Sequence, residues 1–169
     1  MSKGAPKDRP TVLVVDDDPL VLNFIRCLLK RGGFAVDTAE SVDAAISILQ
    51  QRQDIDIVLS DLLMPEKTGE DLHKWLLSHR KDLAETMIAI TGYPDHMTEF
   101  ASQLRREGRF IEKPLKPITI LETTINRVLA QKSADQKQDC KIAETQENPK
   151  VIPGEPLPGW TTKSDPESD

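Results

Sequence analysis

Three consecutive aspartates, Asp16, Asp17 and Asp18, directly follow an apolar run in the segment VLVVDDDPL, residues 12–20. Like charges this close repel each other, and removing them from water costs several kcal/mol per ion. A bound cation, a helix-capping role or plain solvent exposure would each offset that cost. The residues at the ends of the later apolar runs help to separate these explanations.

Asp61, Thr91 and Lys113 each lie at or directly after the end of a later apolar run. If those runs are parallel strands, their carboxyl ends share one edge of a sheet, and these three residues join Asp16 and Asp17 there. Three carboxylates form a hard oxygen site of the kind that suits Mg²⁺. A lysine ammonium and a threonine hydroxyl would neutralise and hydrogen-bond a phosphoryl group, and an aspartate carboxylate can be its nucleophilic acceptor. The pattern predicts a site that phosphorylates one of its own aspartates.

The elements that must position these residues alternate between short apolar runs and segments of helical periodicity. We predict strands at residues 11–15, 34–39, 56–60, 86–91 and 109–112, and helices around residues 19–29, 42–49, 72–76, 95–106 and 118–128. Such alternation implies right-handed crossovers and a parallel sheet covered on both faces. The sequence therefore predicts a doubly wound α/β fold.

The composition changes near residue 132. Residues 133–169 hold five of the 12 prolines, eight acids and four bases, and few large apolar side chains. Such a segment buries too little surface to offset its ordering entropy. We therefore predict a flexible N-terminus at residues 1–9, one folded domain at residues 10–131 and a disordered acidic tail at residues 132–169.

The overall charge limits the classes of partner. The chain has a formal net charge of -6, which gives no basis for binding nucleic acid or anionic membranes. Arg105, Arg106 and Arg109 form a small basic group that we interpret as a solvated face. Cys27 and Cys140 suggest no disulfide framework, and no apolar run approaches the roughly 18 residues of a membrane helix. The N-terminus has no apolar core of a signal peptide, so we expect a soluble, cytoplasmic protein.

Four blocks carry a resemblance to a known family: VLVVDDDP, DIVLSDLLMPEKTG, IAITG and FIEKPL. In their order, spacing and strand-terminal positions they resemble the receiver domain of bacterial two-component response regulators, across about residues 10–131. The resemblance implies a flavodoxin-like fold with strand order 2-1-3-4-5. It also implies a signalling domain that catalyses only its own phosphorylation and dephosphorylation, rather than an enzyme.

The resemblance assigns a role to each acid of the cluster. It implies that Asp61 is the phosphoacceptor, which takes a phosphoryl group from a phosphohistidine on a sensor histidine kinase or a histidine phosphotransfer protein. Asp16 and Asp17 would hold Mg²⁺ together with Asp61 and the backbone carbonyl of Leu63.

The resemblance also implies a conformational switch. Thr91 would donate its hydroxyl to the phosphoryl group, Lys113 would pair with it, and the Lys113–Pro114 peptide is often cis in the family. Phe110 occupies the aromatic switch position that couples to Thr91. Phosphorylation would then alter the face formed by the fourth helix, fifth strand and fifth helix, which a downstream protein effector reads.

Some positions depart from the family pattern. Phe110 stands where many members have Tyr, so a switch that needs a phenolic hydroxyl is unavailable, and Gly92 stands where Ala is common. Asp18 precedes Pro19, and we interpret it as a helix N-cap rather than a metal ligand. Thr68 replaces a frequent Asp, which should matter little because Gly69 supplies backbone freedom.

Other functions remain open from the sequence. The leading hypothesis is a stand-alone receiver; a phosphate sink or relay intermediate would use the same residues, and phosphorylation-dependent dimerisation is undetermined. An aspartyl-nucleophile phosphatase resembling the haloacid dehalogenase superfamily would use Asp16 and Asp18. However, Leu20 stands where that superfamily usually has Thr or Val, and the acid pair expected after Lys113 is missing.

Two side chains near the site predict slow loss of the phosphoryl group. Leu63 follows Asp61 by two positions, and Tyr93 follows Thr91 by two. An apolar and a bulky group there would hinder an attacking water molecule. We therefore expect slow self-dephosphorylation.

Overall fold

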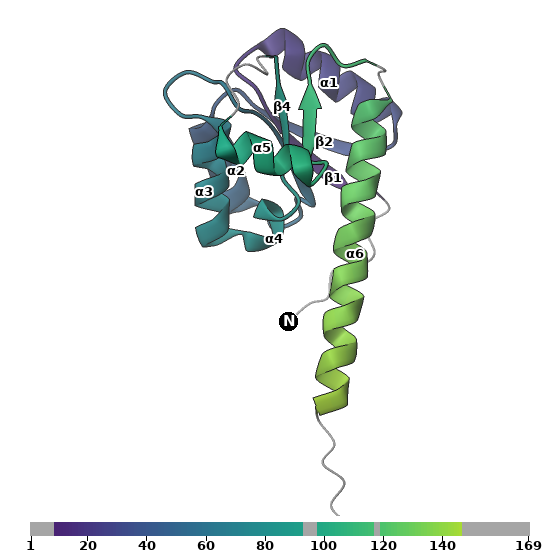
Figure 1. Ribbon diagram of the computed structural model, residues 1–169. Helices are drawn as coiled ribbons and strands as arrows, with labels where there is room; N and C mark the ends of the chain where they lie inside the picture. The colour runs from purple at the N-terminus through teal and green to yellow at the C-terminus, as the bar shows by residue number, and fades with distance from the viewer. Residues whose placement is uncertain (1–8, 93–97, 117–118, 147–169) are drawn as a thin grey trace, which may run out of the picture. The chain divides into compact units, whose positions relative to one another are not determined.

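The computed structural model describes residues 9–92, 98–116 and 119–146. Strands and helices alternate along the chain, as the hydrophobic pattern predicts, except that two helices lie between the third and fourth strands (Figure 1). The strands are β1 (Thr11–Val15), β2 (Ala35–Ala39), β3 (Ile57–Asp61), β4 (Ile88–Thr91) and β5 (Phe110–Glu112). The helices are α1 (Pro19–Arg31), α2 (Val42–Gln51), α3 (Gly69–His79), α4 (Lys81–Ala84), α5 (Glu99–Arg106) and α6 (Ile120–Gln146).

The five strands form one sheet in the order β2-β1-β3-β4-β5, and every neighbouring pair is parallel. The predicted doubly wound α/β fold and its strand order are confirmed. Because all strands run in the same direction, their carboxyl ends lie at one edge of the sheet, and β1 and β3 are direct neighbours there.

Two apolar clusters, one on each face of the sheet, form the core. On one face, α1 and α6 pack on alternate strand residues; the large buried side chains include Val12, Val14, Leu59, Ile90, Ile111, Leu121 and Ile125. On the other face, α2, α3 and α4 pack on the intervening residues; the buried side chains there include Leu13, Val15, Val58, Met87, Leu49, Leu72 and Leu83. Burial on both faces explains why the strands are apolar runs rather than alternating ones.

Side-chain caps define where four helices begin. Asp18, Ser41, Thr68 and Thr98 each accept a hydrogen bond from a backbone N–H in the first turn of α1, α2, α3 and α5, respectively. Such caps satisfy N–H groups that have no partner within the helix. The cap role predicted for Asp18 is therefore confirmed.

Helices α4 and α5 differ from the sequence prediction. The four-residue helix α4 was not predicted, because a single turn is too short to show a hydrophobic period. Helix α5 begins at Glu99 rather than at residue 95; the predicted start falls in residues 93–97, which lie outside the described residues.

The helix at the end of the predicted domain extends past the predicted boundary at residue 131. Helix α6 runs through Gln146, so residues 132–146 are helical rather than disordered. This stretch has no Pro or Gly and contains three Lys, three Gln and two Ala, which favour helix; the prolines of the tail begin at residue 149. A first compact unit reaches Asp135, and a second begins at Gln136. Residues 1–8 and 147–169, where flexible ends were predicted, lie outside the described residues.

Within the described ranges, neither α6 nor any shorter helix combines the length and apolar character that crossing a membrane requires.

Gly69, the first residue of α3, lies against the end of β3. A Cβ atom at this position would be 2.3 Å from the carbonyl oxygen of Asp61 and 3.1 Å from the Cα atom of Leu62. The Gly69 N–H also donates to the Leu62 carbonyl at 3.2 Å. The backbone at Gly69 does not have a positive φ angle, so the predicted reason for glycine, conformational freedom, is wrong. Close approach of two backbone segments is what requires it.

Gly92 offers a matched contrast, since a Cβ atom there would make ordinary contacts, 3.8 Å from Cβ and 3.9 Å from Cδ of Lys113. We predict that Gly69→Ala lowers the free energy of unfolding by about 1–3 kcal/mol, because the backbone must shift. Gly92→Ala should change it little or raise it by about 0.4–1 kcal/mol, because alanine restricts the unfolded chain. Urea unfolding measures both; a Gly69→Ala variant as stable as the parent would contradict the steric explanation.

Candidate functional site

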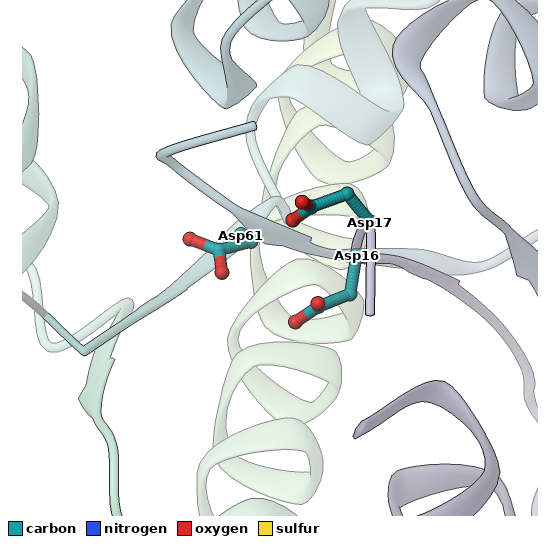
Figure 2. Close-up of side chains that lie close together, drawn as sticks. All are labelled: Asp16, Asp17 and Asp61. Carbon is teal, nitrogen blue, oxygen red and sulfur yellow. The ribbon is translucent and has the colours of Figure 1, made fainter. Parts of the chain in front are cut away.

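Three carboxylates meet at the carboxyl edge of the sheet. Asp16 and Asp17 follow β1, and Asp61 is the last residue of β3, the strand next to β1. One carboxylate oxygen from each lies within 4.8 Å of the others, and Figure 2 shows the three side chains close together. Asp16 and Asp61 are buried, whereas Asp17 is exposed. The structure thus brings together the three acids that the sequence analysis selected.

The ammonium group of Lys113 joins two of these acids. Its Nζ atom donates to Oδ2 of Asp16 at 2.7 Å and to Oδ2 of Asp61 at 2.6 Å. The Asp16 and Asp61 side chains are only 3% and 10% exposed, and that of Lys113 is 22% exposed, so these ion pairs are largely shielded from water. Burial alone would lower the pKa of Lys113, but the hydrogen bonds and charges of the two carboxylates outweigh burial and raise this pKa above its ordinary value.

The remaining carboxylate oxygens are held by the backbone. Oδ1 of Asp16 accepts a hydrogen bond from the N–H of Asp18 at 3.0 Å, and Oδ1 of Asp61 accepts one from the N–H of Leu63 at 3.0 Å. Each buried acid is thus fixed by Lys113 on one oxygen and by a backbone N–H two residues later on the other. Fixed carboxylates of this kind are pre-organised for binding a cation or a phosphoryl group.

The carboxylate of Asp18 is not part of this cluster, although its backbone N–H holds Asp16. Its Oδ1 atom accepts from the N–H of Leu20 at 2.8 Å, as the cap of α1. An Asp-x-Asp phosphatase site would need Asp16 and Asp18 to act together. In this chain the Asp18 side chain caps α1, whereas the Asp16 side chain pairs with Lys113. The geometry therefore does not favour the phosphatase alternative.

Lys113 reaches the acids across the end of β4. The strand order places β4 between β5, which Lys113 follows, and β3, which carries Asp61. The Lys113 N–H donates to the Thr91 carbonyl at 2.8 Å, and its aliphatic stem passes near Gly92. The Lys113–Pro114 peptide is cis, as the resemblance implies. Small residues at the end of β4 therefore leave room for the lysine side chain to reach Asp61 and Asp16.

Thr91 and Phe110 lie on neighbouring strands beside this cluster. Thr91 is 2% exposed and is in register with Glu112, while Phe110 is in register with Ala89, two residues before Thr91. Phe110 is half-buried. Because paired residues of parallel strands point to the same face, Thr91 and Phe110 share one face of the sheet.

Of the two residues expected to slow dephosphorylation, the structure describes Leu63. Leu63 is 42% exposed, and its N–H donates to the Asp61 carboxylate. Tyr93 lies outside the described residues. The Leu63 carbonyl as a metal ligand stays a prediction.

Sequence reasoning missed two features around the site. The close approach of Gly69 to Asp61 was not foreseen, because it depends on a distance between two segments. The arginines of residues 105–109 were interpreted as one solvated face, but they make different contacts. Arg109 is only 12% exposed and donates to the carbonyl oxygens of Ala84 and Met87, whereas Arg105 lies over the Phe110 ring.

Comparisons with known proteins agree with this architecture. The family model of the response regulator receiver domain matches residues 12–125. The chain is 28% identical over 129 residues to the two-component response regulator ORR3 of Oryza sativa subsp. indica, covering 76% of this chain and 97% of that protein. It is 31% identical over 107 residues to the response regulator SaeR of Staphylococcus aureus, covering 63% of this chain and 45% of that protein.

Solved structures give the same result. The crystal structure of a response regulator receiver domain protein from Clostridium thermocellum superimposes with a TM-score of 0.65 at 28% sequence identity, covering 74% of this chain and 98% of that one. The family match spans more than half of the sequence and includes β2 to β5 and all of β1 except Thr11. The chain therefore belongs to the response regulator receiver domain family.

Proposed function

We propose that this receiver domain accepts a phosphoryl group on Asp61 from a phosphohistidine of a sensor histidine kinase or a histidine phosphotransfer protein. The observation that carries the proposal is the Lys113 ammonium, which bridges Asp16 and Asp61 at the strand edge. In the transfer, a carboxylate oxygen of Asp61 attacks phosphorus while the bond from phosphorus to the histidine nitrogen breaks. The products are an acyl phosphate on Asp61 and a neutral imidazole on the donor, whose ring leaves with its other nitrogen protonated.

The burial of the three acids favours Asp61 as the acceptor. Asp16 is 2% exposed and Asp61 is 8% exposed, so Asp61 is the more accessible of the two acids that Lys113 contacts. Asp17 is exposed, and among the described hydrogen bonds the Lys113 ammonium donates to Asp16 and Asp61 rather than to Asp17. A partly shielded carboxylate beside a fixed ammonium can accept the phosphoryl group while water is restricted.

The donor set also fits a magnesium ion. Asp16, Asp17 and Asp61 supply hard oxygen ligands, and the backbone carbonyl of Leu63 would complete the protein's share. When bound, Mg²⁺ neutralises charge on the carboxylates and on the phosphoryl oxygens. The backbone N–H groups of Asp18 and Leu63 keep the Asp16 and Asp61 carboxylates oriented for this purpose.

Lys113 and Thr91 would then stabilise the phosphorylated state. The ammonium that contacts Asp61 can turn to a phosphoryl oxygen, and the Thr91 hydroxyl can donate to another. Movement of Thr91 would change the space available to Phe110 on the same face. The predicted fourth and fifth helices correspond to α5 and α6, because α4 was not predicted. The surface formed by α5, β5 and α6 would carry this change to a downstream protein effector.

The acceptor role can be tested with acetyl phosphate and Mg²⁺. We predict that the parent chain gains the mass of one phosphoryl group and that Asp61→Asn gains none, because the amide cannot form the acyl phosphate. Intact-protein mass spectrometry gives the readout. Asp18→Asn is the matched control, since an asparagine cap preserves α1 and leaves the phosphoryl site intact.

Two outcomes would contradict this assignment. An equal mass gain on Asp61→Asn would place the acceptor elsewhere. Turnover of small phosphate monoesters that is lost in Asp16→Asn but kept in Asp61→Asn would instead support the phosphatase alternative.

The charge balance at the site can be tested with Lys113→Met. In buffer with EDTA, we predict a loss of about 2–4 kcal/mol in the free energy of unfolding, because two shielded carboxylates lose their cation. Adding Mg²⁺ should recover more stability in Lys113→Met than in the parent, because the metal is then the remaining source of positive charge. Urea unfolding with EDTA or Mg²⁺ measures both effects.

The matched control for this experiment is Lys116→Met, which changes an exposed lysine of the same loop. It should be close to the parent in both buffers. A Lys113→Met variant as stable as Lys116→Met in EDTA would show that the ion pairs contribute little.

The exposed side chain of Leu63 provides a kinetic test. We predict that the phosphorylated parent persists for minutes or longer and that Leu63→Asn loses its phosphoryl group several-fold faster, because a polar side chain admits water. Phosphoprotein decay after removal of acetyl phosphate gives the rate. Leu77→Asn, at a 52% exposed position of α3, controls for loss of an exposed leucine. Decay of the parent within seconds would refute the prediction.

A further inference from the structure

Arg105 connects helix α5 to strand β5 through two contacts. Its guanidinium carbon lies 5.5 Å from the centroid of the Phe110 ring, a cation–π distance. Its Nη2 atom lies 3.9 Å from Oε2 of Glu112. A single side chain in the last turn of α5 therefore contacts two of the three residues of β5.

The position of the two contacts follows from the strand geometry. Successive residues of a strand point to opposite faces, so Phe110 and Glu112 share one face and Ile111 points to the other. Ile111 is 3% exposed and packs in the cluster beneath α1 and α6. Arg105 therefore contacts side chains on the opposite face of β5 from the one that packs in that cluster.

This face leads directly to the proposed phosphoryl site. Phe110 and Glu112 are in register with Ala89 and Thr91 of β4. The next residue, Lys113, donates its N–H to the Thr91 carbonyl and its ammonium to Asp61. Arg105 therefore contacts the aromatic residue of the switch and the residue directly before the lysine of the site.

The neighbouring arginines make no such contact in the described part of the chain. Arg106 pairs with Glu99 of its own helix at 3.0 Å. Arg109 donates to Glu107 and to backbone carbonyl oxygens. Arg106 has a similar exposure to Arg105, 65% against 56% for the side chains, which makes Arg106 a matched control.

We propose that Arg105 is a latch that holds the Phe110 ring in its half-buried position and so restrains the switch. The proposal rests on the proposed function, since it takes Phe110 as the side chain that responds to phosphorylation. Phenylalanine has no hydroxyl, so no hydrogen bond from the ring can fix its position. The Arg105 guanidinium over the ring face stabilises the half-buried position instead. The ring must lose this contact when it turns toward Thr91.

The latch predicts that replacement of Arg105 increases both the population of the displaced Phe110 ring and the rate of phosphorylation. Cation–π contacts at exposed sites correspond to about a two- to fivefold change in an equilibrium. Arg105→Gln should therefore raise the population of the displaced ring, and the rate of phosphorylation by acetyl phosphate, by about two- to fivefold. Arg105→Lys should restore part of the restraint, because an ammonium also binds an aromatic face.

Fluorine NMR of the full chain labelled with 4-fluorophenylalanine tests the contact itself. The chain contains four phenylalanines, and loss of a signal in Phe110→Leu identifies the one from residue 110. Without a phosphoryl donor, Arg105→Gln should shift the Phe110 signal, Arg105→Lys should shift it less, and Arg106→Gln should leave it unchanged. An unchanged signal in Arg105→Gln, or an equal shift in Arg106→Gln, would overturn the latch.

Phosphorylation kinetics test its regulatory role. The rate increase from Arg105→Gln should disappear in the Phe110→Leu background, because the latch acts through the ring. The same increase in both backgrounds, or no increase in either, would overturn the proposal. If the parent chain gains no phosphoryl group, the proposed function fails, and the fluorine spectra alone then decide whether Arg105 holds Phe110.

Discussion

The ion pairs of Lys113 with Asp16 and Asp61 are the constraint on which the site depends. The paired residues are 97 and 52 positions apart in the sequence, so no local structure can bring them together. The lysine follows β5 and must pass over β4 to reach β3 and β1, which requires this strand order and small residues at the end of β4. Without a cation at this edge, shielded carboxylates would repel each other and weaken the sheet where its strands meet the loops.

Most of the fold and the positions of the site residues were accessible from the sequence. Doubly buried strands appear as continuous apolar runs, and the parallel arrangement brings their carboxyl ends together. Asp61, Thr91 and Lys113 could therefore be selected as strand-end residues before any distance was known. The separation of Asp18 from Asp16 and Asp17 was equally accessible, because the following proline marks the first position of a helix.

The features that sequence reasoning missed depend on distances between segments or on weak local signals. Nothing in the letters around Gly69 reveals that the Asp61 carbonyl lies against it. Arg105 and Arg106 are adjacent and chemically identical, yet one contacts β5 and the other pairs within α5. The end of α6 was misjudged because the prolines after residue 148 were averaged with a proline-free stretch that is helical.

The short strand β5 links the contacts of two cations, Lys113 and Arg105, which would have opposite effects on movement of the strand. Lys113, directly after the strand, binds the carboxylates at the edge, while Arg105 binds Phe110 and Glu112 on the strand itself. A phosphoryl group on Asp61 would draw Lys113 and Thr91 toward new oxygens, whereas the Arg105 contacts keep β5 attached to α5. Because β5 has only three residues, a short segment of chain separates Phe110 from Lys113. A movement of Lys113 would therefore also move Phe110. The relative strengths of the Lys113 and Arg105 contacts would then determine how readily phosphorylation of Asp61 changes the surface formed by α5, β5 and α6.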